Sequence, residues 1–142
     1  MKVSFKFDDK IGFISDDGKN QIKIKNSIVN DEQYHSPTEM VLMAMGACSS
    51  DDVLNIIMKM KNSIESYRCE IEGEKRDEHP KILKYAKIHY IFNGDVKPED
   101  VNKAVSLSMT KYCSVSLMVK NAGVPVSYYY TINGKDYEMN SD

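Results

Sequence analysis

The strongest constraint on the fold is a helix signal that begins at Ser36. The segment Ser36-Pro37-Thr38-Glu39 has the form of a capping box, with proline at the first helical position. No other proline precedes Asn62, so the pattern predicts one helix of about 26 residues, roughly 39 Å long. Its first part, MVLMAMGAC, is apolar on every side, which predicts a buried helix. A helix this long needs more cover than 142 residues provide, which favours a dimer.

Patterns of alternating residues flank this helix on both sides. The first third of the chain alternates in three short segments separated by polar turns, which predicts a three-stranded meander. Two strands follow the helix, then helices that begin near Pro98 and Ser114, and then a hairpin with an Asn133-Gly134 turn. The order β-β-β-α-β-β-α-α-β-β predicts a single α+β domain over residues 1–142, with antiparallel sheets packed on a long central helix. The apolar residues that define the later elements are Val53, Leu54, Ile57, Met58, Tyr67, Cys69, Ile71, Ala86, Ile88, Tyr90, Phe92, Val101, Ala104, Val105, Leu107, Val126, Tyr128, Tyr130 and Ile132.

Charge and composition limit the classes of partner. The formal net charge is −2 and no run of basic residues stands out, so we expect no nucleic-acid partner. The longest nearly apolar run, Met40 to Cys48, has nine residues, whereas a bilayer span needs about 20, so we expect no membrane segment. The amino terminus lacks the apolar region of a signal peptide. These features predict a cytoplasmic protein whose three cysteines are free thiols.

The three cysteines differ in their surroundings. Cys69 lies between Tyr67 and Ile71 on the inward side of a strand, so we expect it to serve in packing. Cys48 lies where the apolar helix turns abruptly polar. It is therefore either a core cysteine at a helix crossing or a redox thiol at the wall of an apolar pocket with a wet mouth. Methionines are core filler in the first interpretation and an adaptable pocket wall in the second.

Cys113 lies in the first turn or at the N-cap of the helix near Ser114. Backbone N–H groups and the helix dipole favour a thiolate there, and Lys111 adds a nearby cation; the alternative is a buried cap residue. Pairing of a cysteine with His35 or His89 in a hydrolase stays open. The histidines and cysteines lack metal-ligand spacing, so we expect no metal and no other cofactor. Glu39 is most simply the capping residue.

Two segments resemble the cysteine motifs of the OsmC/Ohr family, the osmotically inducible and organic hydroperoxide resistance proteins. Residues 36–48, continuing into Asp52-Val53, are similar to the first cysteine helix of that family. Lys111-Tyr112-Cys113-Ser114-Val115, with Gly123-Val124-Pro125-Val126 beyond it, resembles the second cysteine segment. The order of elements also agrees, so the resemblance covers essentially the whole chain. The sequence around Cys48 is similar to a branch of uncharacterised OsmC-like proteins.

The resemblance implies both an assembly and a chemistry. Members are intertwined homodimers with sites at the subunit interface, and they act in the oxidative stress response. Carried over, Cys48 is the peroxidatic thiolate that attacks an organic or hydrogen peroxide and becomes a sulfenic acid. Cys113 is the resolving cysteine that condenses with it to a disulfide, which a dithiol reductant then opens. Glu39 is the candidate supporting residue near the helix start.

Departures from the family pattern sustain a second hypothesis. The peroxidases use an arginine from the amino-terminal strands, but this chain has none before Arg68, which leaves Lys10 or Lys19 as replacements without the planar fork of arginine. Counting back ten residues from Cys48, the partner glutamate of the family falls at Thr38, one residue before Glu39. The alternative is a non-enzymatic dimeric OsmC-like module that binds a small apolar ligand in the same pocket.

Overall fold

The computed structural model describes residues 1–139, which fall in two compact units. The first is Met1–Val41 and the second Leu42–Asp142, so the boundary lies inside helix α1 (Pro37–Lys59). The elements follow the predicted order, with one π-helical turn added between the second and third helices. The single domain over the whole chain stays a prediction.

The first unit contains a small antiparallel sheet. Strands β1 (Phe5–Asp8), β2 (Gly12–Ser15) and β3 (Lys23–Ile24) pair in the order β1-β2-β3, which confirms the predicted meander. The rings of Phe5 and Phe13 pack with their centroids 4.9 Å apart. Phe5 and Phe7 are nevertheless 55% and 53% exposed. The aromatic surface of this strand is therefore not covered within the described chain.

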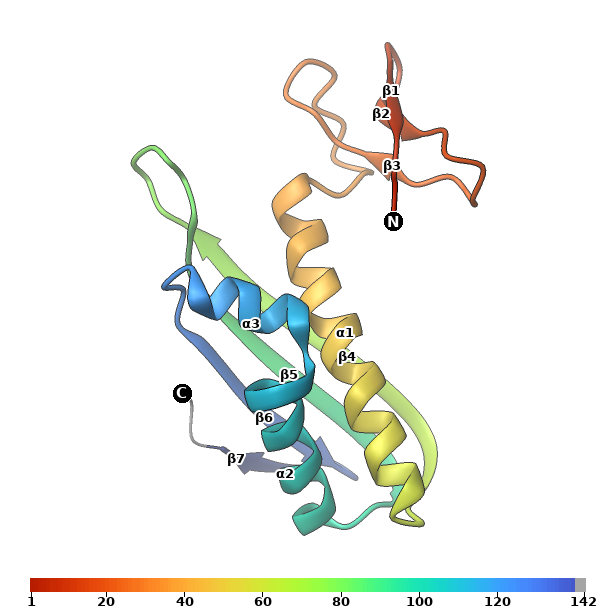
Figure 1. Ribbon diagram of the computed structural model, residues 1–142, viewed down its shortest axis with the longest axis vertical. Coiled ribbons are helices and arrows are strands. Elements are labelled where there is room, and N and C mark those ends of the chain that lie inside the picture. The colour runs from red at the N-terminus through yellow and green to blue at the C-terminus, as the bar shows by residue number, and fades with distance from the viewer. Residues whose placement is uncertain (140–142) are drawn as a thin grey trace. The chain divides into compact units, whose positions relative to one another are not determined.

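The second unit is built on a four-stranded sheet (Figure 1) of β4 (Ser63–Lys75), β5 (Leu83–Asp95), β6 (Val126–Ile132) and β7 (Lys135–Glu138), in that order. The pairs β4–β5 and β6–β7 are antiparallel, as expected. The β5–β6 pair is parallel, which differs from the all-antiparallel prediction. The reason is the connection between them, which runs through helices rather than a hairpin and so returns the chain in the same direction.

That connection contains helix α2 (Pro98–Leu107), the π-helical turn η1 (Ser108–Tyr112) and helix α3 (Ser114–Asn121). In Figure 1, α1, α2 and α3 lie on the same face of the four-stranded sheet. The core between them contains the alternating residues predicted for β5, α2 and β6. These buried residues are Ala86, Ile88, Tyr90, Phe92, Val101, Ala104, Val105, Val126, Tyr128, Tyr130 and Ile132.

Helix α1 is shorter and less buried than the sequence pattern indicated. It ends at Lys59, three residues before the expected Asn62. Lys61, just beyond the helix, adopts a positive φ of 64°, which is typical of a helix end. Met45, Val53 and Ile57 are fully buried in the core. The prediction that its first part is buried on every side is wrong within this chain. Large apolar side chains at both ends of α1 are exposed, namely Val41 (41%), Met43 (51%) and Met58 (55%).

By length and composition, α1 is also apolar enough to cross a membrane. Core helices of globular proteins meet the same criterion, and α1 contributes to the core of the second unit through three fully buried side chains.

Gly46 sets how closely α1 approaches β4. A Cβ at this position would overlap Cδ1 and Cγ1 of Ile71 and lie 3.4 Å from the Cys69 sulfur. Gly46 is buried and lies two residues before Cys48. Because Gly46 has no side chain, the turn of α1 that carries Cys48 can pack closely against β4.

We expect Gly46→Ala to destabilise the fold by about 1 kcal/mol. Overpacking against Ile71 costs about 1–3 kcal/mol, which exceeds the gain of about 1 kcal/mol that alanine normally gives within a helix. In an Ile71→Ala background the obstacle is gone, so the same substitution should stabilise the protein by about 1 kcal/mol. Urea unfolding of the four proteins measures both effects. Equal effects of Gly46→Ala in the two backgrounds would show that the two positions do not meet.

Candidate functional site

The structure brings two of the three cysteines together in the second unit. Cys48 lies in the middle of α1 and is partly exposed, whereas Cys113, just before α3, is fully buried. Both are free thiols. Cys48 lies near enough to Cys113 to contribute, after burial, to the raised pKa of the Cys113 thiol. The two sequence-predicted cysteines therefore lie near each other, one partly exposed and the other buried, and their shared catalytic role stays a prediction.

Cys113 is the N-cap of α3, as predicted. Its backbone is extended (φ −77°, ψ 93°), and its sulfur accepts a hydrogen bond from the Ser116 N–H at 3.4 Å. The same sulfur lies 3.0 Å from the Ser116 hydroxyl and 3.9 Å from the Met45 carbonyl oxygen of α1. These contacts attach the start of α3 to the turn of α1 that precedes Cys48.

Burial dominates the ionisation of Cys113. Loss of solvation raises its pKa above the ordinary thiol value; the Ser116 hydroxyl and N–H lower it, and Cys48 raises it again. The helix N-terminus therefore favours the thiolate as expected, but burial outweighs it. The ammonium group of Lys111 lies 5.3 Å from the centroid of the Tyr112 ring, and its effect on Cys113 stays a prediction.

A chain of buried hydroxyl groups lies beside the thiol pair. The Ser49 hydroxyl is 2.5 Å from the Tyr90 hydroxyl and 3.0 Å from that of Ser108, and Ser108 donates to Asp52 at 2.9 Å. Ser49 and Ser108 are fully buried. Sequence reasoning missed this chain. Its only local signal is the pair Ser49-Ser50 on a face of α1 that otherwise enters the core.

Cys69 serves in packing and is not part of the Cys48–Cys113 pair. It packs against the core, as predicted, and burial raises the pKa of its thiol. Hydrogen bonds with Ser50 and Tyr67 act in the opposite direction, and these two residues join each other at 2.6 Å between their hydroxyl oxygens. The packing role of Cys69 is thereby confirmed.

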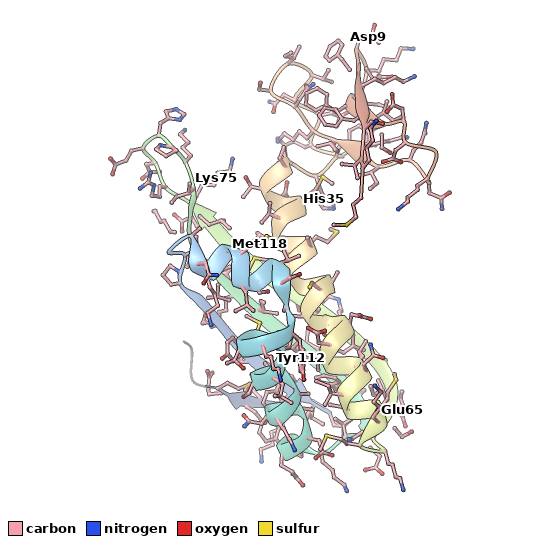
Figure 2. The ribbon with its side chains drawn as sticks, viewed as in Figure 1. Asp9, His35, Glu65, Lys75, Tyr112 and Met118 are labelled. Carbon is pink, nitrogen blue, oxygen red and sulfur yellow. The ribbon has the colours of Figure 1, made fainter. Side chains whose placement is uncertain are left out.

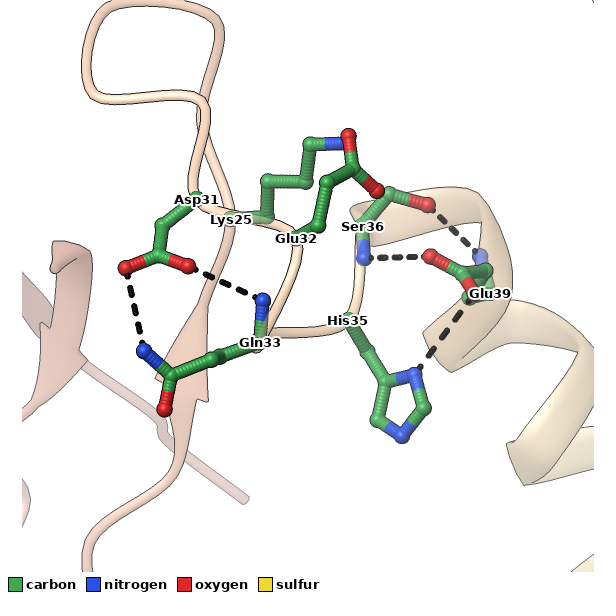
Figure 3. A network of polar contacts seen from close by, with 7 residues as sticks. All are labelled: Lys25, Asp31, Glu32, Gln33, His35, Ser36 and Glu39. Atoms are coloured by element: carbon green, nitrogen blue, oxygen red, sulfur yellow. Dashed lines mark hydrogen bonds and ion pairs between the residues drawn. The ribbon is translucent and has the colours of Figure 1, made fainter.

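Glu39 belongs to the first unit, where its capping role is confirmed (Figure 3). Its carboxylate accepts from the Ser36 N–H at 2.9 Å, and the Ser36 hydroxyl accepts from the Glu39 N–H at 3.2 Å. These bonds hold the pKa of Glu39 below its ordinary value, with a further contribution from His35, whose Nδ1 lies 3.6 Å from the carboxylate. A supporting role of Glu39 in catalysis stays a prediction.

Two other sequence hypotheses concern histidines and metals. His89 alternates with the inward-facing Ile88 and Tyr90 on β5, so it lies on the sheet face opposite the helices, where its Nε2 is 2.6 Å from the Thr131 hydroxyl. A hydrolase pair between His89 and either site cysteine is therefore excluded. Within residues 1–139, no three or more His, Cys, Asp or Glu side chains are grouped so that they could hold a metal ion.

Known proteins match this chain in sequence and in fold. Residues 30–128 match the family described as OsmC-like protein. Protein YhfA of Escherichia coli K12 is 40% identical over 98 residues, which are 68% of this chain and 72% of YhfA.

Solved structures are similar to this chain in fold. A hypothetical protein from Aquifex aeolicus VF5 has a TM-score of 0.81 at 28% identity, covering 93% of this chain and 95% of the other. A protein from Legionella pneumophila described as the organic hydroperoxide resistance protein OsmC has a TM-score of 0.61 at 12% identity, covering 93% and 96%, and so shares the fold. The family match spans most of the chain and both cysteine segments. The chain therefore belongs to the OsmC-like protein family.

Proposed function

We propose that this protein is a thiol-dependent peroxidase that reduces organic or hydrogen peroxides through Cys48 and Cys113. The observation that carries the proposal is the proximity of a partly exposed cysteine, Cys48, to a fully buried one, Cys113. In this proposal a peroxide reaches the partly exposed Cys48, and the neighbouring Cys113 reacts with the product. Membership of a family that includes organic hydroperoxide resistance proteins supports the same chemistry.

The reaction has three steps. The Cys48 thiolate attacks one peroxide oxygen, the O–O bond breaks, and the alcohol (or water) leaves after taking up a proton, so that Cys48 becomes a sulfenic acid. The Cys113 thiolate then attacks the Cys48 sulfur, forming the disulfide and releasing hydroxide, which is protonated to water. A dithiol reductant finally supplies two electrons and two protons and returns both cysteines to thiols.

A homodimer is the assembly that the surface favours. Apolar side chains of the second unit that are at least half exposed include Met43 and Met58 on α1, Tyr112 on η1 and Met118 on α3 (Figure 2 labels Tyr112 and Met118). Val3, Phe5 and Phe7 are similarly exposed in the first unit. A second copy that covered the long helix α1 would remove Met43 and Met58 from water, which favours association.

The alternative, a ligand-binding module without enzymatic activity, is favoured by one observation. Burial raises the pKa of Cys113, so most of this thiol is protonated at neutral pH, which disfavours its attack on a sulfenic acid. In that case the apolar surroundings of the pair receive a small apolar molecule, and neither cysteine turns over.

Stoichiometric peroxide separates the two functions. Reduced protein given one equivalent of cumene hydroperoxide should lose two free thiols and form a Cys48–Cys113 disulfide, detected by peptide mapping. Cys48→Ser should abolish peroxide consumption, because the attacking sulfur is gone. Cys113→Ser should leave one turnover and accumulate a sulfenic acid that dimedone traps, because only resolution is lost.

Cys69→Ser is the matched control, since Cys69 serves in packing and should change stability without changing thiol loss. Retention of all free thiols under peroxide in wild-type protein would contradict the peroxidase proposal and leave the ligand-binding alternative.

Resolution should accelerate with pH. Because burial raises the pKa of Cys113, this residue is largely thiol at pH 7, and its thiolate fraction rises about tenfold per pH unit below that pKa. Stopped-flow measurement should therefore show disulfide formation from the preformed sulfenic acid about tenfold faster at pH 8 than at pH 7. A rate independent of pH over this range would show that Cys113 does not attack as a thiolate limited by its own ionisation.

The assembly is tested by light scattering coupled to size exclusion. At micromolar concentration the particle should have twice the chain mass of 16.2 kDa. Met43→Lys should shift it toward the monomer, because a desolvated charge replaces an apolar contact. The control Asp51→Ala, also exposed on α1, should leave the mass unchanged. A stable monomer for wild-type protein would exclude the dimer.

A further inference from the structure

In the chain of hydroxyl groups formed by Tyr90, Ser49 and Ser108, the donor of each hydrogen bond can be assigned. Asp52 is a carboxylate that only accepts, so the one hydroxyl proton of Ser108 points to it. Ser49 must then donate to Ser108, and Tyr90 must donate to Ser49. Every hydroxyl proton in the chain is thereby used, and each bond polarises the next. The chain joins β5, the centre of α1 and the turn η1 into one connected unit that ends on a negative charge.

Ser108 is the residue where this chain meets the thiol pair. Its side chain is bonded to two residues of α1, Ser49 and Asp52, which lie one and four positions after Cys48. Its backbone carbonyl accepts from the Cys113 N–H at 2.7 Å, the bond that closes the π-helical turn. The side chain thus holds the α1 turn that carries Cys48, while the main chain holds Cys113.

We propose that Ser108, fixed by Asp52, is a positioning residue that holds the Cys113 sulfur against Cys48 for disulfide formation. The inference rests on the thiol pair of the proposed function. Neither Ser108 nor Asp52 reacts; both act through the placement of Cys113. Disulfides tolerate only a narrow range of separations, with Cβ atoms about 3.5–4.5 Å apart. A small displacement of η1 relative to α1 is therefore enough to weaken the pair.

The test measures the equilibrium of the disulfide without any peroxide. In a Cys69→Ser background only two thiols remain, and the protein is equilibrated with defined ratios of oxidised and reduced dithiothreitol. Cys48 and Cys113 lose two electrons and two protons as their S–S bond forms, and the cyclic disulfide of the reagent gains them. Peptide mapping after an acid quench gives the fraction of Cys48–Cys113 disulfide, and hence the equilibrium constant.

We expect Ser108→Ala and Asp52→Ala each to lower this constant about tenfold, because each removes the partly buried, charge-assisted hydrogen bond that holds Ser108 in place. Asp52→Asn keeps an oxygen that accepts from Ser108, so it should stay within about threefold of the parent. Two nearby residues that are not part of the hydroxyl network serve as controls. Thr110→Ala, on the same π turn, loses only a bond to the Ser106 carbonyl, and Asp51→Ala loses only contacts to Asn55; neither should change the constant.

A purely structural role would lower the thermal midpoint without changing the constant measured on folded protein at 25 °C. Constants for Ser108→Ala and Asp52→Ala within twofold of the parent would overturn the inference. If Ser108→Ala fails to fold, the comparison of Asp52→Asn with Asp52→Ala decides it. A protein that consumes no peroxide but shows the expected ranking would refute the proposed function and still support the positioning role.

Discussion

The packing of α1 against the four-stranded sheet determines where the chemistry of the second unit lies. Met45 and Ser49, four residues apart, face the core on one side of this helix. Cys48 and Asp52 form the adjacent row, so they lie at the edge of the buried face, where both are partly exposed. The orientation of α1 about its axis therefore places the Ser49 hydroxyl in the core and the Cys48 thiol at the edge of the core. It also places the Asp52 carboxylate within hydrogen-bond distance of η1.

Local signals predicted most of this arrangement. The start of α1 follows from Ser36 and Glu39, whose capping bonds need no distant partner. The N-cap position of Cys113 follows in the same way from the helix that begins after it. The parallel pairing of β5 and β6 did not follow, because strand direction depends on how the intervening helices pack. The exposure of Met43 did not follow either, since an apolar helix surface has the same pattern whether its own chain or another copy covers it.

The site was predictable in its sulfur atoms and not in its hydroxyl groups. A cysteine is rare enough to be noticed; Cys48 lies at a break in polarity, and Cys113 lies at the start of a helix. Serine is common on helices, so Ser49 and its neighbour Ser50 are only a weak signal until their partners are known. Those partners, Tyr90 and Ser108, are 41 and 59 residues away in the sequence. Only the fold shows that these three buried hydroxyls bond one another and end on Asp52 at the edge of the core.

The same burial that protects Cys113 also slows it. A fully enclosed thiol is shielded from external oxidants and thiols, but its pKa is raised because the thiolate loses solvation. The N–H and hydroxyl of Ser116 partly compensate by stabilising the Cys113 thiolate. The positive end of the α3 dipole acts in the same direction. Under the proposed function, the partly exposed Cys48 is then the sulfur at which both the peroxide and the reductant must act. Attack of the reductant on Cys48 releases Cys113 as the leaving thiolate, and Ser116 is positioned to stabilise that charge as it forms.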